Sequence, residues 1–350
     1  MSILLYGATG YTGELIAREM VHRGLTPTLA GRDRDRVRRV AADLDRPSEV
    51  VSLDDTDLLR GVVGDHEAVV HCAGPFVDTT GPMVDACLDT GTHYLDLTGE
   101  VAVFERLAAR DDDARDASVT LLPGVGFDVV ATDCLARSLA DRCVEPRELR
   151  LAVDTSARLS RGTLRTAVEG LGTGTLVRRD GRLVHVPIGW GTRRVSFDGD
   201  EKPVTTVSLG DLSTAYRSTG IGTIETAVAV PGWARPGLSL AGYAEPAFAS
   251  EPVRSGVRRL IGVLPRGPSE AERERGSARI HGEVVGETTV SGLLSTPEPY
   301  TTTVRTTIAA IEEGLDGVEP GFQTPSTAFG AEFVDGIEGI EWVHGPEQTI

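Results

Sequence analysis

A glycine-spaced turn follows the first apolar segment of the chain and constrains the fold more than any other feature. Ile3 to Tyr6 is an apolar run typical of a buried parallel strand, and Glu14 to Arg23 has the apolar spacing of a helix packed on a sheet. Glycine permits a tight turn and lets a pyrophosphate approach the amides at a helix N-terminus. The sequence therefore predicts a dinucleotide-binding turn, although a strand-to-helix connection that binds nothing has the same pattern. The residues of this turn are Gly7, Ala8, Thr9, Gly10, Tyr11, Thr12 and Gly13.

The residues after the second predicted strand, Thr26 to Ala30, indicate which dinucleotide binds. The chain has Gly31, Arg32 and Asp33 where an NAD site would place an acidic residue on the ribose. Arg32 can pair with a 2′-phosphate and stack on adenine, which favours NADP(H) over NAD(H). Two interpretations of Asp33 stay open: it binds the ribose, or it is the N-cap of a helix through Val37 to Leu44.

Length and composition favour a two-domain cytoplasmic protein. At 350 residues the chain exceeds what one hydrophobic core normally supports, so a cofactor domain and a substrate domain are expected. The four cysteines form no C-x-x-C pair and the seven histidines lie singly, so neither a disulfide framework nor a metal site is predicted. No basic leader and no apolar stretch of about 18 residues is present, so we expect neither export nor a transmembrane anchor.

The charge of the chain is strongly acidic. Its net charge is −17, and Lys202 is the only lysine among 35 basic residues. Such a surface repels nucleic acid, which binds through clustered basic side chains, so nucleic acid is excluded as a partner. The composition indicates an acidic halophile-type surface that stays soluble in a salt-rich cytoplasm, where salt screens the self-repulsion.

Strands alternate with helices through the first third of the chain. This rhythm predicts a doubly wound parallel sheet, in which ligands gather at the carboxyl ends of the strands. The further strands expected are Val50 to Leu53, Ala68 to Ala73, Tyr94 to Leu97 and Val119 to Leu122, and the helices include Pro82 to Asp89, Val101 to Arg115 and Val129 to Leu139.

Three of these strand ends carry candidate functional residues. The fourth strand ends in small residues that permit close backbone approach and can surround a nicotinamide; they are Cys72, Ala73, Gly74, Pro75 and Phe76. The fifth strand supplies Tyr94, Asp96 and Glu100, and the sixth leads to Asp128. We expect these four side chains to include substrate-contacting, catalytic groups. The alternative is structural: Asp128 is an adequate N-cap, and Asp96 or Glu100 can hold loop amides.

The pattern changes after about Arg142. Strand-like segments divided by Gly/Asp turns now predominate, with a helix from Gly162 to Leu171, which indicates a sheet with a helix laid on it. Thr301 to Glu313 is a further predicted helix, and Ile340 to Val343 is expected to pack near the cofactor domain. The segments are Glu148 to Thr155, Arg182 to Val186, Arg193 to Phe197, Pro203 to Ser208, Thr223 to Val230, Arg279 to Val285 and Thr288 to Gly292.

Several sequence blocks resemble the saccharopine dehydrogenase-like oxidoreductases, in particular the branch with the trans-acting enoyl reductases. The resemblance implies an NADP-binding Rossmann domain at 1–142, an inserted α+β substrate and dimerisation domain on a mixed or antiparallel sheet at 143–296, and a segment at 297–350 that returns to the Rossmann domain. The blocks are GATGYTG at 7–13, AGRD at 30–33, CAGPF at 72–76, GTHYLDLTGE at 91–100, PGVGFDVVATD at 123–133, RGTLRTAVEG at 161–170, GDLSTAYRSTGIGTIET at 210–226 and GPSEAERERG at 267–276.

The expected activity is hydride transfer from NADPH to an electron-poor carbon. For an enoyl substrate, loop amides, Tyr94 or Tyr216 would stabilise the enolate oxygen. The alternatives are reduction of an imine, for which Arg193, Arg194 and Arg217 would clamp carboxylates, and an NADP-binding sensor or scaffold without catalysis. The few strand arginines favour an apolar acyl substrate.

The stretch from Pro231 to Pro268 has a different character. It is rich in apolar residues, with arginines before its last apolar cluster. Two interpretations stay open: a flap that contacts lipid or a second copy of the chain in a homodimer, or a loop and helix that cover the sheet.

Overall fold

The computed structural model describes residues 1–155, 158, 160–164, 174–230 and 251–349, and the chain divides into two compact units. Met1–Val130 and Tyr300–Gly330 form the first unit, and Ala131–Pro299 and Ala331–Ile350 form the second. The first boundary therefore lies at residue 130 instead of 142. The predicted return of the whole segment 297–350 to the Rossmann domain is wrong for residues 331–350, because they belong to the second unit.

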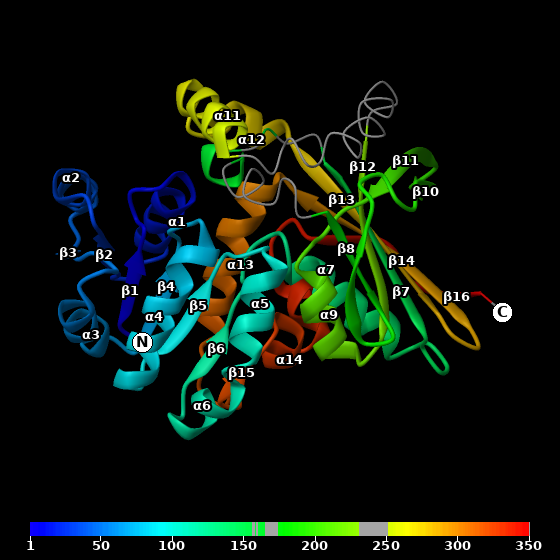
Figure 1. Cartoon of the computed structure of the whole chain (residues 1–350), viewed down its shortest axis with the longest axis horizontal. Coiled ribbons are helices and arrows are strands. Elements are labelled where there is room, and N and C mark those ends of the chain that lie inside the picture. The colour runs from blue at the N-terminus through cyan, green and yellow to red at the C-terminus, as the bar shows by residue number, and fades with distance from the viewer. Residues whose placement is uncertain (156–157, 159, 165–173, 231–250, 350) are drawn as a thin grey trace. The chain divides into compact units, whose positions relative to one another are not determined.

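The first unit contains a seven-stranded sheet in the order β15-β6-β5-β4-β1-β2-β3 (Figure 1). All its neighbouring strands are parallel. The order of β1 to β6 is that of the dinucleotide-binding Rossmann fold, so the predicted fold class is confirmed. The strands are β1 (Ile3–Tyr6), β2 (Thr28–Gly31), β3 (Ser48–Val50), β4 (Ala68–His71), β5 (His93–Asp96), β6 (Thr120–Leu122) and β15 (Gly321–Phe322).

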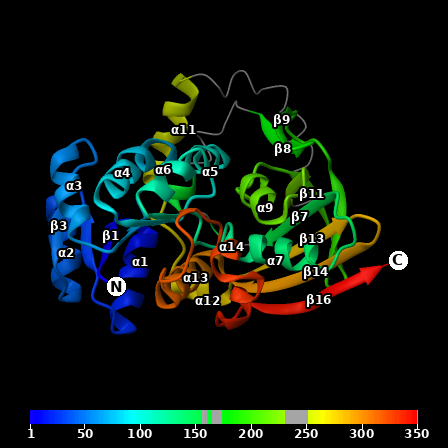
Figure 2. The same ribbon diagram turned by 90° about the horizontal axis from the view of Figure 1, so that it is seen from below.

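Helices connect these strands, and one of them comes from the C-terminal part of the chain. The rings of Tyr11 and Tyr300 lie 5.1 Å apart at the beginnings of α1 and α13, and Arg23 pairs with Glu312 at 3.6 Å near their ends. α1 and α13 are therefore parallel neighbours (Figure 2). The helices are α1 (Tyr11–His22), α2 (Arg34–Leu44), α3 (Thr56–Gly64), α4 (Phe76–Thr90), α5 (Val101–Ala108), α6 (Asp111–Asp116), α13 (Pro299–Glu313) and α14 (Pro325–Phe329).

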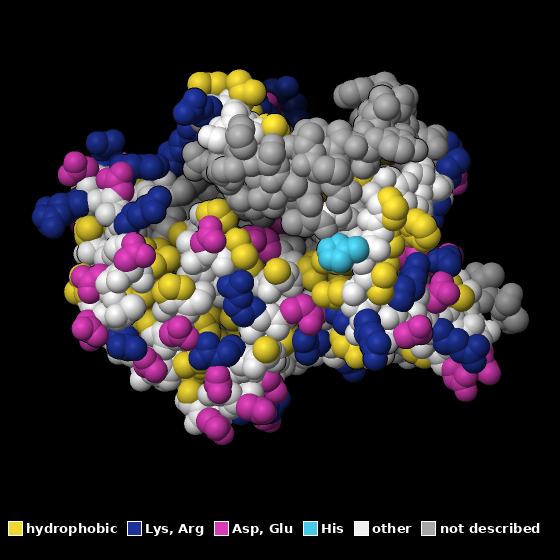
Figure 3. Space-filling model, in the orientation of Figure 1, with side chains coloured by type: hydrophobic (Ala, Val, Ile, Leu, Met, Phe, Trp, Pro, Cys, Tyr) yellow, Lys and Arg dark blue, Asp and Glu magenta, His cyan; other side chains and the backbone are white. Residues whose placement is uncertain are grey.

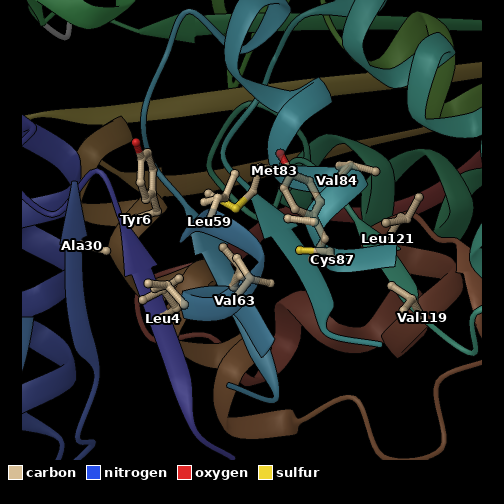
Figure 4. Packing of buried hydrophobic residues seen from close by; sticks show 14 of the residues in the cluster. Leu4, Tyr6, Ala30, Leu59, Val63, Met83, Val84, Cys87, Val119 and Leu121 are labelled. Carbon is tan, nitrogen blue, oxygen red and sulfur yellow. The ribbon is translucent and has the colours of Figure 1, made fainter. Parts of the chain in front are cut away.

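A hydrophobic core joins the sheet of the first unit to α3 and α4. Leu59 and Val63 of α3 and Met83 and Cys87 of α4 are fully buried in it. Tyr94 of β5 belongs to the same cluster and has no exposed surface. The labelled part of this core consists of Leu4, Tyr6, Ala30, Leu59, Val63, Met83, Val84, Cys87, Val119 and Leu121 (Figure 4).

The largest differences from the predicted elements of this unit concern β3, α4 and the segment from Val101 to Arg115. β3 covers Ser48–Val50 and ends where the prediction of Val50 to Leu53 begins. α4 begins six residues before Pro82, although proline is favoured in the first turn of a helix, and so includes Pro82 in its interior. The predicted helix from Val101 to Arg115 is two helices, because a new helix starts at Asp111 with three acidic residues in its first turn.

The second unit contains a nine-stranded mixed sheet, as the fold class predicted. Its main order is β10-β11-β12-β7-β13-β14-β16, and β8 pairs with β12 and β9. Only β12 and β7 are parallel among these described pairs. The strands are β7 (Glu148–Thr155), β8 (Thr175–Arg179), β9 (Arg182–Val186), β10 (Arg193–Phe197), β11 (Asp200–Thr206), β12 (Thr223–Ala229), β13 (Ser277–Val285), β14 (Thr289–Pro297) and β16 (Glu341–Thr349).

One face of this sheet is covered by α7 (Val130–Ala140). A Cβ atom on Gly282 of β13 would lie 2.7 Å from Leu139 and 3.0 Å from Leu135, so these leucines of α7 pack directly against the glycine. The predicted helix from Gly162 to Leu171 lies outside the described residues from 165 onward, and residues 161–164 are helical. The other helices are α9 (Asp211–Thr219), α11 (Glu251–Val263), α12 (Glu270–Arg275) and the 3-10 helix η2 (Ala331–Gly336).

Candidate cofactor and active site

The glycine turn brings three backbone segments into close contact at the carboxyl end of β1. Gly7 has a left-handed φ of +86°, and a Cβ atom on it would lie 2.8 Å from the nitrogen of Ala73. A Cβ atom on Gly13, in the first turn of α1, would overlap the carbonyl oxygen of Gly7. Glycine is therefore required at both positions, and the first turn of α1 is held next to the end of β4.

The first turn of α1 provides the chemistry expected for a phosphate. Gly10 is the N-cap, and its amide donates to the carbonyl of Gly7 at 2.9 Å. The amides that follow an N-cap have no acceptor within the helix, and they carry the positive end of the helix dipole. The rings of Tyr11 and Tyr300 form a T-shaped pair, which fixes the position of the Tyr11 side chain at the beginning of α1. The turn is therefore suited to a pyrophosphate.

The end of β2 carries Arg32, which is exposed. Asp33 is the N-cap of α2, and its Oδ1 accepts a hydrogen bond from the backbone amide of Arg36 at 3.1 Å. The structure thus contains the capping role that was one of two interpretations of Asp33. Burial raises the pKa of Tyr6, and the nearby charge of Arg32 opposes that rise, which places the guanidinium close to the end of β1.

The loop from Cys72 to Phe76 follows β4 directly and is fixed by side chains that the sequence analysis did not select. The hydroxyl of Thr79 donates to the carbonyl of Ala73 at 2.6 Å, and Nε2 of His71 lies 3.0 Å from the same hydroxyl. His71 is fully buried, and burial lowers its pKa to about 3, so the ring is neutral at physiological pH. The loop is therefore held rigidly beside Gly7.

Tyr94 and Asp96 form a buried hydrogen-bonded pair rather than an accessible catalytic group. The phenol of Tyr94 donates to Oδ2 of Asp96 at 2.7 Å. Oδ1 of Asp96 accepts from the amides of Thr98 and Gly124, both at 2.9 Å. Burial raises the pKa of Asp96 to about 6. Both side chains lie at the carboxyl end of β5 and are fully buried, and a catalytic role for either stays a prediction.

Glu100 and Asp128 have different environments. Oε1 of Glu100 accepts from the amide of Phe76 at 2.9 Å, so this carboxylate holds the beginning of α4, and its burial raises its pKa. Asp128 is exposed and lies beside Gly99, on which a Cβ atom would be 3.1 Å from Oδ2 of the carboxylate. Asp128 is thus the exposed residue among the predicted carboxylates, but the surrounding protein desolvates its carboxylate and raises its pKa to about 6.

The remaining candidates belong to the second unit. The guanidinium of Arg178 lies 4.3 Å from the ring centroid of Tyr216. Arg193 and Arg194 are consecutive on β10, so they point to opposite faces, and they pair with Glu225 and Glu201 respectively. The predicted carboxylate clamp is therefore not assembled by these two arginines, and the third member, Arg217, is an exposed residue of α9.

Neither a metal-binding cluster nor a membrane-spanning helix is found among the described residues. No group of three or more His, Cys, Asp or Glu side chains there is arranged to hold a metal ion. No helix in the same ranges has the length and apolar character required to span a membrane.

Comparisons with known proteins agree with this geometry. Residues 3–122 match the family model described as the saccharopine dehydrogenase NADP binding domain. The first unit is therefore an NADP-binding Rossmann domain of that type. The resemblance to the saccharopine dehydrogenase-like oxidoreductases is thus confirmed for residues 3–122, which match the family model.

The similar proteins carry two different names. A trans-acting enoyl reductase of Mycobacterium leprae is 33% identical over 153 residues, which are 41% of this chain and 37% of that protein. A probable mitochondrial saccharopine dehydrogenase-like oxidoreductase of Arabidopsis thaliana is 29% identical over 193 residues, which are 48% of this chain and 42% of that protein. The matches thus span well under half of these relatives.

The fold as a whole has a solved counterpart. Saccharopine dehydrogenase (L-Glu forming) from Saccharomyces cerevisiae covers 100% of both chains with a TM-score of 0.65, at 12% identity. This likeness concerns the fold alone.

Proposed function

We propose that this protein is an NADP(H)-dependent oxidoreductase that reduces an electron-poor C=C bond of an apolar acyl substrate. The observation that carries the proposal is the contact of the glycine turn with the Cys72–Phe76 loop. That contact joins a phosphate-binding helix terminus to a rigid strand end within one NADP-binding domain. NADPH supplies the hydride when it is bound, and the chain has to orient it and stabilise the charge left on the substrate.

Different residues of the chain would orient NADPH and stabilise the charge on the substrate. Thr79 and Glu100 hold the two ends of the Cys72–Phe76 loop, so the surface that this loop offers the nicotinamide is fixed before binding. Tyr94 is not available as a proton donor, because its buried hydroxyl is bonded to Asp96. Backbone amides of the loop, Asp128 and Tyr216 remain as candidates for stabilising a developing enolate.

Two alternatives compete with the proposed reaction. Reduction of an imine made from an amino acid requires a basic site for carboxylates, and Arg193 and Arg194 are instead paired with glutamates on opposite faces of β10. An NADP-binding sensor without catalysis requires only the first unit.

The decisive experiment mixes the purified protein and NADPH with enoyl-thioester, imine and carbonyl compounds and follows the nicotinamide absorbance. Consumption of NADPH with enoyl thioesters alone supports the proposal. Consumption with imines alone contradicts it, and binding without turnover across the panel favours the sensor.

The described part of the 231–268 stretch supports lipid contact as a second proposal. Residues 231–250 lie outside the described residues. α11 exposes Leu260 and Val263 to 69% and 80%, and Arg259 beside them is also exposed. Figure 3 shows hydrophobic and basic side chains next to each other on this part of the surface. Apolar and basic side chains together favour an anionic lipid surface. We expect the protein to float with anionic liposomes, and Leu260→Asp to reduce flotation at least threefold. Failure of the wild type to float would exclude this contact.

A further inference from the structure

Arg36 links the two loops that surround the ribose position of a Rossmann domain. It is the third residue of α2, and its Nη2 donates to the carbonyl oxygen of Thr9 at 2.7 Å, across 27 positions of sequence. Its backbone amide is bound by Asp33, so the start of the side chain is fixed as well. The guanidinium therefore extends from the beginning of α2 to the glycine turn.

The direction of Arg36 distinguishes it from the other arginines of α2. Val37 and Ala41 are the buried residues that face the sheet. At about 100° per residue, Arg36 lies on one flank of this buried stripe, and Arg34 and Arg38 lie on the other. Arg39 lies on the side of the helix opposite the stripe. The bond to Thr9 shows that the Arg36 flank faces the glycine turn. Position, not charge alone, thus singles out Arg36 on this helix.

The position matches the chemistry of a phosphorylated ribose. In a dinucleotide-binding Rossmann domain the adenosine ribose lies at the carboxyl end of β2, beside the turn that binds the pyrophosphate. Thr9 belongs to that turn, and Arg32 follows β2 directly. A guanidinium has five N–H donors in a planar fork that suits phosphate, and the bond to Thr9 uses one of them.

We propose that Arg36 is a second ligand of the 2′-phosphate of NADP(H), acting together with Arg32, and so a residue that determines cofactor specificity. The inference rests on the cofactor part of the proposed function and does not depend on the substrate. The competing role is purely structural, with Arg36 holding the glycine turn in place for any dinucleotide.

The test measures dissociation constants of NADPH and NADH by titration for the wild type, Arg36→Ala and Arg36→Lys. Displacement by 2′,5′-ADP and by 5′-AMP is measured beside them, because these probes differ in the 2′-phosphate. Arg34→Ala and Arg38→Ala are matched controls, with the same charge removed from the other flank of α2.

We expect Arg36→Ala to weaken NADPH and 2′,5′-ADP at least tenfold and NADH and 5′-AMP less than twofold. Arg36→Lys, which keeps the charge but not the fork, should lie between the two, and it replaces the alanine variant if that one does not fold. The controls should change each constant less than twofold.

Four results would overturn the inference. Equal losses for NADPH and NADH would assign Arg36 the structural role, unchanged NADPH binding would assign it none, and equal losses in the controls would show a general charge effect. A wild type that binds no NADPH would remove the cofactor assignment and this inference together. Tight NADPH binding without turnover would remove only the proposed reaction.

Discussion

Replacement of Tyr94 by phenylalanine separates a structural role of this residue from a catalytic one. The substitution deletes one hydroxyl, which donates to Asp96 at 2.7 Å and lies 3.4 Å from Thr80. A buried hydrogen bond to a charged group contributes about 1.5–3 kcal/mol to stability, and one between neutral groups about 0.5–1.5 kcal/mol. The cost of Tyr94→Phe should therefore depend on the charge of Asp96.

The charge of Asp96 changes within an accessible pH range. Burial raises its pKa to about 6 in the folded protein. The carboxyl of Asp96 is thus mostly neutral at pH 5 and ionised at pH 8. Its protonation in the folded state contributes stability at low pH, and this contribution is lost as the pH rises through 6. Against an ordinary pKa near 3.9, that loss corresponds to about 3 kcal/mol. We expect Tyr94→Phe to lower the free energy of unfolding by about 2–3 kcal/mol at pH 8 and by about 1 kcal/mol at pH 5.

The assay is urea unfolding followed by circular dichroism at both pH values, at one fixed high salt concentration. Tyr6→Phe is the matched control, because the Tyr6 hydroxyl donates to the backbone carbonyl of Val51 at 3.1 Å, an acceptor that does not titrate. Its cost should be about 1 kcal/mol at both pH values. The reasoning is refuted if Tyr94→Phe leaves the unfolding free energy unchanged at both pH values. A large fall in NADPH turnover with unchanged stability would place the phenol in the chemistry.

Three further predictions concern the cofactor turn and the surface. Arg32→Ala should weaken NADPH by one to two orders of magnitude, about 1.4–2.8 kcal/mol, with little effect on NADH in the same titration, and equal losses would contradict the 2′-phosphate assignment. Gly13→Ala should abolish NADPH binding, because a Cβ atom there overlaps the turn. Gly61→Ala in α3 is the matched control, because a Cβ atom there meets nothing within 4 Å, and it should raise the free energy of unfolding by about 0.5–1 kcal/mol. With a net charge of −17, the melting temperature should rise from low to molar KCl, and a flat or falling profile would exclude a salt-adapted surface.

Local patterns were sufficient for the Rossmann half of the fold. The glycine spacing and the apolar runs predict β1, α1 and the parallel order, because each is encoded by residues a few positions apart. The position of β16 could not be obtained in this way. Its partner is β14, with Leu294 opposite Trp342, and that pairing depends on complementary edges far apart in the sequence.

Local patterns are likewise not sufficient to predict how the residues of the candidate site are arranged. The alternation of a strand does not show that Tyr94 points into the core, because a parallel sheet is covered on both faces. The partner of Asp96 across 28 positions, Gly124, and the partner of Arg36 across 27, Thr9, are equally invisible in a local pattern. Local sequence patterns therefore place these residue types at the strand ends but do not separate them by role.

Hydrogen bonds within the first unit separate the residues that hold loops in place from those that can contact a ligand. Asp96 and Glu100 use their oxygens on backbone amides, so changing their charge would release the loops they hold, and this makes them poor acids or bases for a reaction. Arg32 and Asp128 are exposed at the ends of β2 and beyond β6, where a charge can act on a ligand without breaking the fold. We therefore propose that exposed guanidiniums and helix amides recognise the cofactor, whereas the buried carboxylates hold the loops beside it in place.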